Sequence, residues 1–229
     1  MADRRTVLTA LCATALAPLA RAAAPAFEER RHYVVLPVRQ PSQVAAGKVE
    51  VTEVFSYGCP ACYQFEPTMT QLRAKLPANA QAAYVHASWN KAESWPVFQR
   101  AFIAAQLMGF SERSHTATFG AIWTDNGPLA VADVKTGRLR PKQPTIEDVA
   151  RFYASRKFCD EAEFVKIAKS FAAETKIRQS DALVKAYQVS GTPSLVVAGR
   201  YRLEMQAVSS IEQLAGLVQF LVQKAATTG

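Results

Sequence analysis

Residues 51–62 are Val51-Thr52-Glu53-Val54-Phe55-Ser56-Tyr57-Gly58-Cys59-Pro60-Ala61-Cys62. The first half is apolar and β-branched, which is typical of a strand, and a Tyr-Gly turn follows it. After the two cysteines, apolar residues recur at helical spacing, at Tyr63, Phe65, Met69, Leu72 and Leu76. We therefore predict that Cys59 lies where a strand passes into a helix. Pro60 suits the first helical position, because an N–H there would have no partner.

This placement predicts the chemistry of the two cysteines. Free N–H groups at a helix N-terminus favour a negative charge, and they lower the pKa of a cysteine placed there. Because the thiolate is the reactive form, Cys59 is the candidate nucleophile. Cys62 follows one helical turn later with its sulfur facing inward, where it can resolve a mixed disulfide. The pair therefore predicts a centre for two-electron thiol–disulfide exchange.

Two other interpretations of the pair stay open. A C-x-x-C motif is also half of a zinc site, but such a site needs four ligands. The three histidines, His32, His86 and His115, are scattered, and there is no second cysteine pair. An inert structural disulfide would not explain why the pair follows a strand and encloses a proline.

The N-terminus has the pattern of a secretory signal. Arg4 and Arg5 precede the apolar stretch 7–19, and small residues follow up to Ala24. The apolar stretch is too short to span a membrane, and no other stretch is long and apolar enough. The two arginines leave a twin-arginine signal open. We expect residues 1–24 to be removed and the mature protein to be exported and soluble.

The mature chain is expected to be mildly basic. Removing residues 1–24 leaves 24 basic and 18 acidic residues, a net charge of +6 with histidines neutral. No basic stripe is interleaved with aromatic residues, so we expect no nucleic-acid partner. Three cysteines remain after Cys12 is removed. Cys159 lies in a helical stretch and is expected to be a buried, unpaired thiol, with regulation of the active pair as the alternative.

The rest of the chain has strand patterns at both ends and helical patterns between them. Strands are predicted at 32–36, at a sheet edge, and at 49–56 and 81–87, both central. Helical patterns fill about 94–171, interrupted by a basic loop at 135–144, and Thr145 is the expected N-cap of one helix. A short helix at 180–187, a hairpin turning at Gly199 and a final amphipathic helix complete the chain.

Glu53 is a charged residue on an otherwise apolar face of its predicted strand, which it shares with Val51 and Phe55. A carboxyl on that face should be desolvated, with a raised pKa. It precedes Cys59 by six residues, so it is a candidate to take up or return the proton of Cys62. The alternative is an edge-strand glutamate that reaches water. His86 is expected to be a packed strand residue rather than a catalytic base.

The order of elements resembles thioredoxin, and the helical block after the second strand resembles the DsbA family of exported thiol:disulfide oxidoreductases. The matching motifs are Phe55-Ser56-Tyr57-Gly58-Cys59-Pro60-Ala61-Cys62-Tyr63-Gln64-Phe65-Glu66, Val189-Ser190-Gly191-Thr192-Pro193 and the hairpin 197–203. The resemblance implies an α/β protein with a thioredoxin fold and an inserted helical domain. Residues 25–88 and 178–229 would form the thioredoxin-like domain, and residues 89–177 the insertion.

The resemblance also implies roles for single residues. Cys59 resembles the attacking cysteine and Cys62 the resolving one. Pro193 resembles a cis-proline that faces the pair, and Thr192 the residue whose backbone binds the incoming peptide. Glu53 falls where the family carries a buried acid.

The sequence departs from the family pattern at two points. Pro60-Ala61 stands where the commonest DsbA dipeptide is Pro-His, so Cys59 should be less acidic and its disulfide a weaker oxidant. The strand at 81–87 has no lysine to pair with Glu53, so that carboxyl should be protonated more often.

The function implied is that of a periplasmic enzyme that introduces disulfides into reduced exported proteins. A membrane reoxidant of the DsbB type would restore the Cys59–Cys62 disulfide, and we expect no further cofactor, no metal and a monomer. The alternatives are a reductase or isomerase kept reduced by a membrane donor, and a non-catalytic protein that binds peptides or a metal ion.

Overall fold

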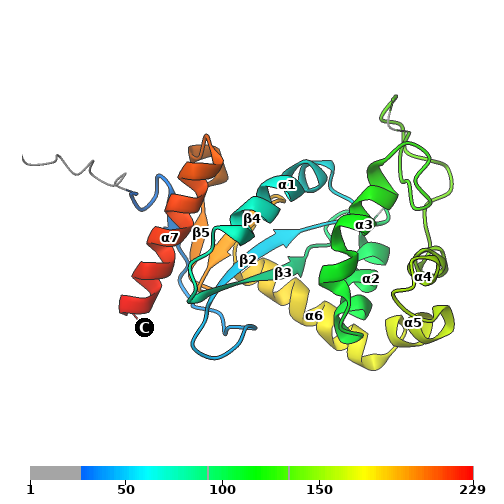
Figure 1. Cartoon of the computed structure of the whole chain (residues 1–229), viewed down its shortest axis with the longest axis horizontal. Helices are drawn as coiled ribbons and strands as arrows, with labels where there is room; N and C mark the ends of the chain where they lie inside the picture. Colours follow the sequence, from blue (N-terminus) through cyan, green and yellow to red (C-terminus); the bar gives the residue numbers. More distant parts are fainter. Residues whose placement is uncertain (1–26, 92, 134, 229) are drawn as a thin grey trace, which may run out of the picture.

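The computed structural model describes residues 27–91, 93–133 and 135–228. Its sheet contains five strands in the order β1-β5-β4-β2-β3 (Figure 1). The strands are β1 (Tyr33–Val35), β2 (Val49–Phe55), β3 (Ala80–His86), β4 (Ser194–Val197) and β5 (Tyr201–Leu203). β2 and β3 are parallel, and the other neighbouring pairs are antiparallel. β2 therefore lies inside the sheet, and its end points toward the helical part of the molecule.

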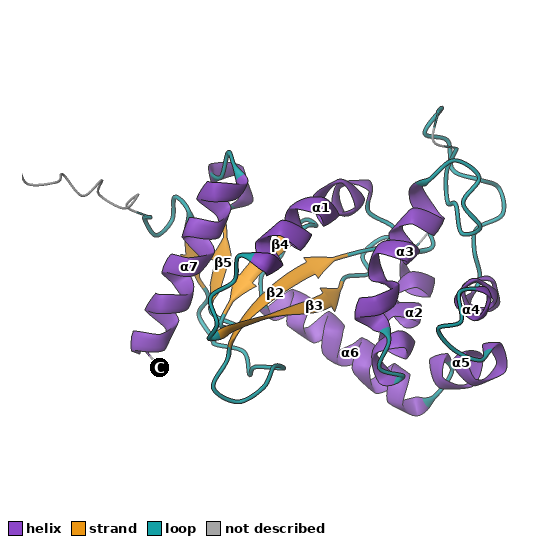
Figure 2. Cartoon of the chain, viewed as in Figure 1, coloured by secondary structure: helices purple, strands orange, loops and turns teal. Residues whose placement is uncertain are grey.

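Helices cover both faces of this sheet. On one face lie α1 (Pro60–Ala74) and α7 (Ile211–Thr228), and on the other lies α6 (Phe171–Ala186). The remaining α-helices, α2 (Trp95–Leu107), α3 (Ser111–Trp123), α4 (Ile146–Ser155) and α5 (Glu161–Ala168), pack together beyond β3, and a 3-10 turn (Met205–Ala207) precedes α7 (Figure 2). The structure thus confirms the predicted fold, a thioredoxin sheet accompanied by a separate group of helices.

Side-chain alternation along β2 divides the core between the two faces. Val51 and Phe55 pack in the cluster that includes residues of α1 and α7, whereas Val54 packs with Val184 and Tyr187 of α6. Because successive strand residues point to opposite faces, Glu53 shares the α1 face with Val51 and Phe55. The face on which this acid lies follows directly from the strand pattern.

Local signals explain several boundaries. Thr145 caps α4 through a reciprocal capping box with Asp148, as its sequence position predicted. The hairpin between β4 and β5 turns at Gly199, whose φ is +61°. A Cβ there would lie 2.5 Å from the carbonyl oxygen of Gln40. The segment between β1 and β2, which contains Gln40, can therefore cross the hairpin only if residue 199 is glycine.

Two predictions about the secondary structure are wrong. The strand near 81–87 is not central, because β3 is the last strand of the sheet; its apolar residues are buried by helices rather than by a further strand. The helix predicted at 180–187 is the end of α6, which begins at Phe171. Its polar, exposed N-terminal half has no apolar stripe that would reveal it.

The division of the chain into domains stays a prediction. The boundary proposed between residues 177 and 178 falls inside α6. The predicted signal, residues 1–24, lies outside the described residues. Within the part that the structure does describe, no helix combines the length and apolarity needed to cross a membrane.

Candidate active site

The cysteine pair lies at the junction between β2 and α1. Cys59 is the N-cap of α1, with an extended backbone at φ −97° and ψ 116°, and Pro60 begins the helix. The Cys59 N–H donates to the carbonyl oxygen of Ser56 at 3.1 Å, and its own carbonyl oxygen accepts from the N–H groups of Cys62 and Tyr63. The predicted position of Cys59 at a strand-to-helix junction is confirmed.

The two sulfurs have opposite acid–base character. Both are free thiols here; Cys59 is 7% exposed and Cys62 is fully buried. The pKa of Cys59 is lowered to about 6, chiefly because the Cys62 thiol hydrogen-bonds its sulfur. Thr192 and the backbone N–H groups of Cys62 and Ala61 add to this effect against the opposing cost of burial. Burial and the neighbouring Cys59 raise the pKa of Cys62 far above its usual range.

A loop from the far end of the chain faces this pair. The Thr192–Pro193 peptide bond is cis, and the Cys59 thiol donates to the carbonyl oxygen of Thr192 across 3.4 Å. The same loop lines a surface pocket together with residues 202–206, which run from β5 into the 3-10 turn.

Side chains from outside the motif hold the backbone before Cys59. The N–H of Tyr57 donates to Nε2 of His86 at 3.0 Å, and Trp123 donates from its indole nitrogen to the carbonyl oxygen of Tyr57 at 2.8 Å. Because Nε2 accepts, the proton of the neutral ring is on Nδ1, which donates to the carbonyl oxygen of Ala87 at 2.8 Å. Burial lowers the pKa of His86 to about 3. His86 is therefore a packed, neutral residue, as expected.

Gly58 allows Trp95 to lie directly against the turn. A Cβ at residue 58 would be 2.7 Å from Cδ1 of Trp95. We expect Gly58→Ala to displace the indole and to lower the free energy of unfolding by about 1–3 kcal/mol, as overpacking does elsewhere. Denaturant unfolding measures this directly.

Gly120 in α3 provides the matched control. Apart from its chain neighbours and the adjoining backbone of its own helix, no atom lies within 4 Å of a Cβ built there, and the residue lies inside a helix. Gly120→Ala should therefore raise stability by about 0.5–1 kcal/mol. If the two alanine variants have equal stability, Trp95 does not constrain the turn.

Glu53 lies on β2 beneath α1 and is 2% exposed. Among the described residues its Oε2 has no hydrogen-bond partner. Its pKa is raised to about 8, first by burial and then by the negative charge of Glu66, while Arg73 acts in the opposite direction. The predicted burial and raised pKa are confirmed, and the alternative of a glutamate that reaches water is excluded. Its role in proton transfer stays a prediction.

Comparisons with known proteins match this architecture. The family model described as thioredoxin matches residues 44–219. Two curated relatives named thiol:disulfide interchange protein DsbA are each 33% identical to this chain. The relative from Pseudomonas aeruginosa aligns over 96% of both chains, and the one from Azotobacter vinelandii over 85% of this chain and 82% of its own.

The chain belongs to the DsbA family of thiol:disulfide oxidoreductases.

Solved DsbA structures agree with this assignment. The Xylella fastidiosa oxidoreductase DsbA superposes with a TM-score of 0.71 at 28% identity, over 86% of this chain and 96% of its own. Pseudomonas aeruginosa DsbA gives 0.69 at 31% identity, over 88% and 96%. Enzymes of the DsbA family work with a redox-active disulfide. In the described ranges, no group of three or more His, Cys, Asp or Glu side chains is arranged to hold a metal ion.

Cys159 agrees only in part with what its sequence position predicted. Cys159 is a free thiol, as predicted, but it is half-buried rather than buried. Burial and the nearby carboxylates of Asp160 and Glu163 raise its pKa to about 11. Such a thiol is a poor nucleophile at neutral pH.

Sequence reasoning missed the side chains that support the site from other elements. Trp95 and Trp123 contact the turn before Cys59, and Glu66 and Arg73 of α1 act on Glu53. Glu66 and Arg73 are seven residues apart, so they share one helix face. That spacing was the available signal, but polar residues seven apart are common on solvated helices.

Proposed function

We propose that this enzyme works in the periplasm as a donor of disulfides to exported proteins, with Cys59 as the nucleophile and Cys62 as the resolving thiol. The observation that carries the proposal is the position of the Cys59 sulfur, at the N-terminus of α1 and 3.4 Å from the carbonyl oxygen of Thr192. A sulfur whose pKa is lowered to about 6 is a good leaving group. It therefore favours release of an oxidised substrate.

The reaction has two exchange steps. A substrate thiolate attacks the Cys59 sulfur of the Cys59–Cys62 disulfide, so the internal S–S bond breaks and Cys62 leaves as a thiolate. Glu53 gives its proton to that thiolate, directly or through water. A second substrate thiolate then attacks the substrate sulfur of the mixed disulfide, and Cys59 leaves as a thiolate. The substrate loses two electrons and the enzyme gains them.

The loop at Thr192–Pro193 would bind the substrate backbone during this exchange. The pocket beside the loop is open, and backbone groups there can pair with an extended peptide. Pro60 and Ala61 tune the reactivity of Cys59, since the N–H of Ala61 is among the groups that lower its pKa. Ala61 supplies no side-chain donor, so the backbone and Cys62 carry this stabilisation.

The proposed partners are reduced exported proteins and a membrane reoxidant of the DsbB type. Reoxidation requires an acceptor for the two electrons taken from each substrate. The signal pattern at 1–24 supports export. We propose that the protein is a monomer and that nucleic acid is not a partner.

The redox state of the pair in cells tests the direction. We expect rapid acid quenching and alkylation of free thiols to find Cys59 and Cys62 mostly oxidised. Deletion of the membrane reoxidant should shift them to the reduced form. A pair that is mostly reduced in otherwise normal cells would instead support the reductase or isomerase alternative. That alternative stays open because residue 61 is alanine, where the commonest DsbA dipeptide has histidine.

A further inference from the structure

His86 is the last residue of β3, and side chains from two helices bind its carbonyl group. The carbonyl oxygen accepts a hydrogen bond from Nε2 of Gln99 on α2 and another from the hydroxyl of Ser180 on α6, each at 3.0 Å. Gln99 also donates to Oδ1 of Asp181 at 2.7 Å. Because β3 is the last strand of the sheet, these side chains replace the hydrogen bonds that a further strand would make here.

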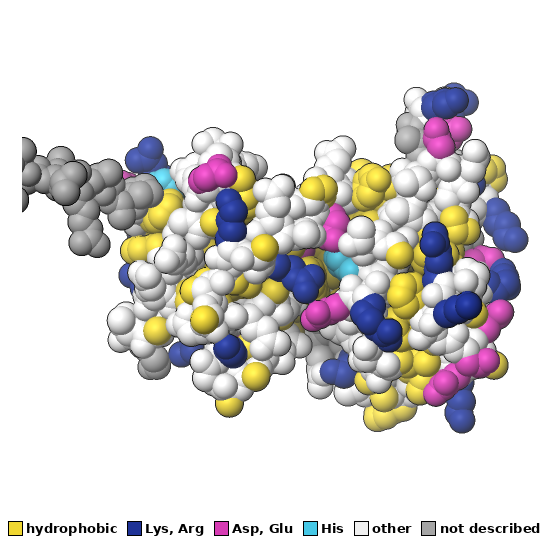
Figure 3. Space-filling model, viewed as in Figure 1, with side chains coloured by type: hydrophobic (Ala, Val, Ile, Leu, Met, Phe, Trp, Pro, Cys, Tyr) yellow, Lys and Arg dark blue, Asp and Glu magenta, His cyan; other side chains and the backbone are white. Residues whose placement is uncertain are grey.

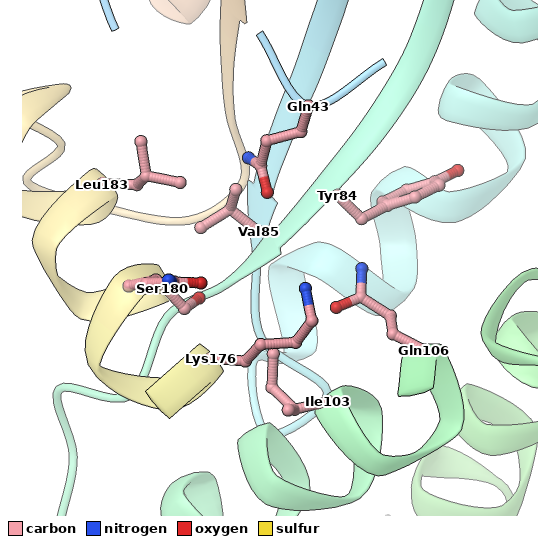
Figure 4. Close-up of a pocket in the computed structure, with 9 residues that line it drawn as sticks. Gln43, Tyr84, Val85, Ile103, Gln106, Lys176, Ser180 and Leu183 are labelled. Atoms are coloured by element: carbon pink, nitrogen blue, oxygen red, sulfur yellow. The ribbon is translucent and has the colours of Figure 1, made fainter. Parts of the chain in front are cut away.

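This network lies where the sheet-bearing half of the molecule meets the helical half. Ser180 of α6 and Val85 of β3, the residue before His86, line the same pocket (Figure 4). On the face drawn in Figure 3, basic and acidic side chains gather where the two halves meet. His86 and Gln99 are 0% and 3% exposed, so their hydrogen bonds are shielded from solvent.

The ring of His86 connects this anchored strand end to the turn before Cys59. Nε2 accepts the N–H of Tyr57 at 3.0 Å, and Nδ1 donates to the carbonyl oxygen of Ala87 at 2.8 Å. The ring also packs against Phe55, with 4.9 Å between the ring centroids. A ring that is hydrogen-bonded at both nitrogens cannot turn without losing one of these bonds.

Tyr57 is also held by α3. Its carbonyl oxygen accepts the indole N–H of Trp123 at 2.8 Å. Both backbone polar groups of this fully buried residue therefore bind side chains of other elements. Two residues later, the N–H of Cys59 donates to the carbonyl oxygen of Ser56 at 3.1 Å and closes the turn. The path of the backbone into α1 is thus fixed from outside the cysteine motif.

We propose that His86 is a positioning residue for Cys59. It accepts the N–H of Tyr57 and so fixes the turn at residues 56–59, while Trp123 binds the carbonyl group of the same residue. The Cys59 sulfur therefore reaches the N-terminus of α1 in one position. Without an acceptor at Nε2, the N–H of Tyr57 would be buried with no partner, and the turn would avoid this cost only by moving. The inference rests on the proposed role of Cys59 as the nucleophile.

A displaced turn affects the two redox states unequally. In the reduced enzyme, the backbone N–H groups of Ala61 and Cys62 stabilise the thiolate of Cys59. In the oxidised enzyme the sulfur belongs to a disulfide and carries no charge, so these groups contribute little. Moving the sulfur away from them therefore destabilises chiefly the reduced form, and the disulfide becomes a weaker oxidant.

His86→Asn and His86→Gln separate the two ring nitrogens. Asparagine places its amide where Nδ1 lies, so it can still donate to Ala87 but has no atom at the position of Nε2. Glutamine is one bond longer and places an acceptor oxygen there for the N–H of Tyr57. The readout is the equilibrium of the Cys59–Cys62 pair with glutathione. His86→Asn should lower the equilibrium constant for reduction about threefold or more, and His86→Gln should stay within about twofold of the wild type.

A titration of the ultraviolet absorbance of the thiolate gives a second readout. The pKa of Cys59 should rise in His86→Asn and stay near the wild-type value in His86→Gln, since only the asparagine variant lets the sulfur leave the helix N-terminus.

Trp123→Phe tests the same turn from the other side and remains decisive if His86→Asn does not fold. Phenylalanine lacks the indole N–H, so the carbonyl group of Tyr57 loses its partner and the glutathione equilibrium should shift in the same direction. Phe164→Leu is the control. Phe164 is fully buried in α5 and packs against Phe110 and Tyr153 rather than against the turn. It should lower the urea midpoint and leave the glutathione equilibrium unchanged.

Equal equilibrium constants for His86→Asn and His86→Gln would overturn the proposal, because the acceptor at Nε2 would then not matter. So would variants that lose stability but keep the wild-type equilibrium, since His86 would then be only structural. These measurements need no protein substrate. An enzyme that proves to be a reductase would still show the difference between the two variants. An oxidase with the same equilibrium in every variant would contradict the inference and leave the proposed function intact.

Discussion

We expect Cys59→Ser to abolish oxidation of a reduced, unfolded protein. A serine hydroxyl cannot form the disulfide that accepts the two electrons, and no other described cysteine occupies the N-terminus of α1. The measurement is the loss of free thiols in the substrate, followed with a stoichiometric amount of the preoxidised enzyme. Activity should fall to the background rate of air oxidation.

Two further cysteine variants make this result specific. Cys62→Ser should also fail to oxidise a reduced substrate. When it is given a substrate that already contains a disulfide, its Cys59 thiolate should attack that S–S bond and release one substrate sulfur as a thiolate, and the mixed disulfide should persist because no buried thiol is present to resolve it. Cys159→Ser should keep full activity, since that thiol has a raised pKa and is not part of the junction. Turnover by Cys59→Ser, or an adduct linked through Cys159, would contradict the assigned roles.

Glu53→Gln should remove a large pH dependence of stability in the oxidised protein. The pKa of Glu53 rises from an ordinary 4.5 to about 8 in the folded state. A raised folded pKa stabilises the protein fully below about pH 4.5, and this contribution is lost as the pH rises through about 8. The wild type should therefore lose about 3–5 kcal/mol across this range, and the glutamine variant should not. Urea unfolding at fixed pH values measures the difference.

Glu50 is the matched control on the same strand. It is also 2% exposed, but its carboxylate accepts hydrogen bonds from Ser42, the N–H of Gln43 and Thr52. Glu50→Gln should change stability while preserving the dependence on pH between 4.5 and 8. Identical pH profiles for the wild type and Glu53→Gln would show that this acid is already ionised in the folded protein, against the desolvation argument.

Much of the site could be predicted because its parts are local. A strand, a turn, a cysteine and a proline at the first helical position are contiguous, and each restricts the next through backbone geometry. The burial of Glu53 followed from the alternation of side chains along its strand. β3 was misplaced as a central strand for a related reason: an apolar run indicates burial, but it does not distinguish burial by a neighbouring strand from burial by helices.

The chain alone therefore determined the junction at Cys59, the face of β2 on which Glu53 lies and the order of the elements, since these depend on neighbours within a few residues. Only the tertiary structure decided which side chains surround them. Thr192 reaches Cys59 from 133 positions along the chain, and α3 brings His115 and Glu112 to α1. Such contacts arise from the packing of distant segments. The spacing of apolar residues along a helix does not predict which polar residues of two helices will contact each other.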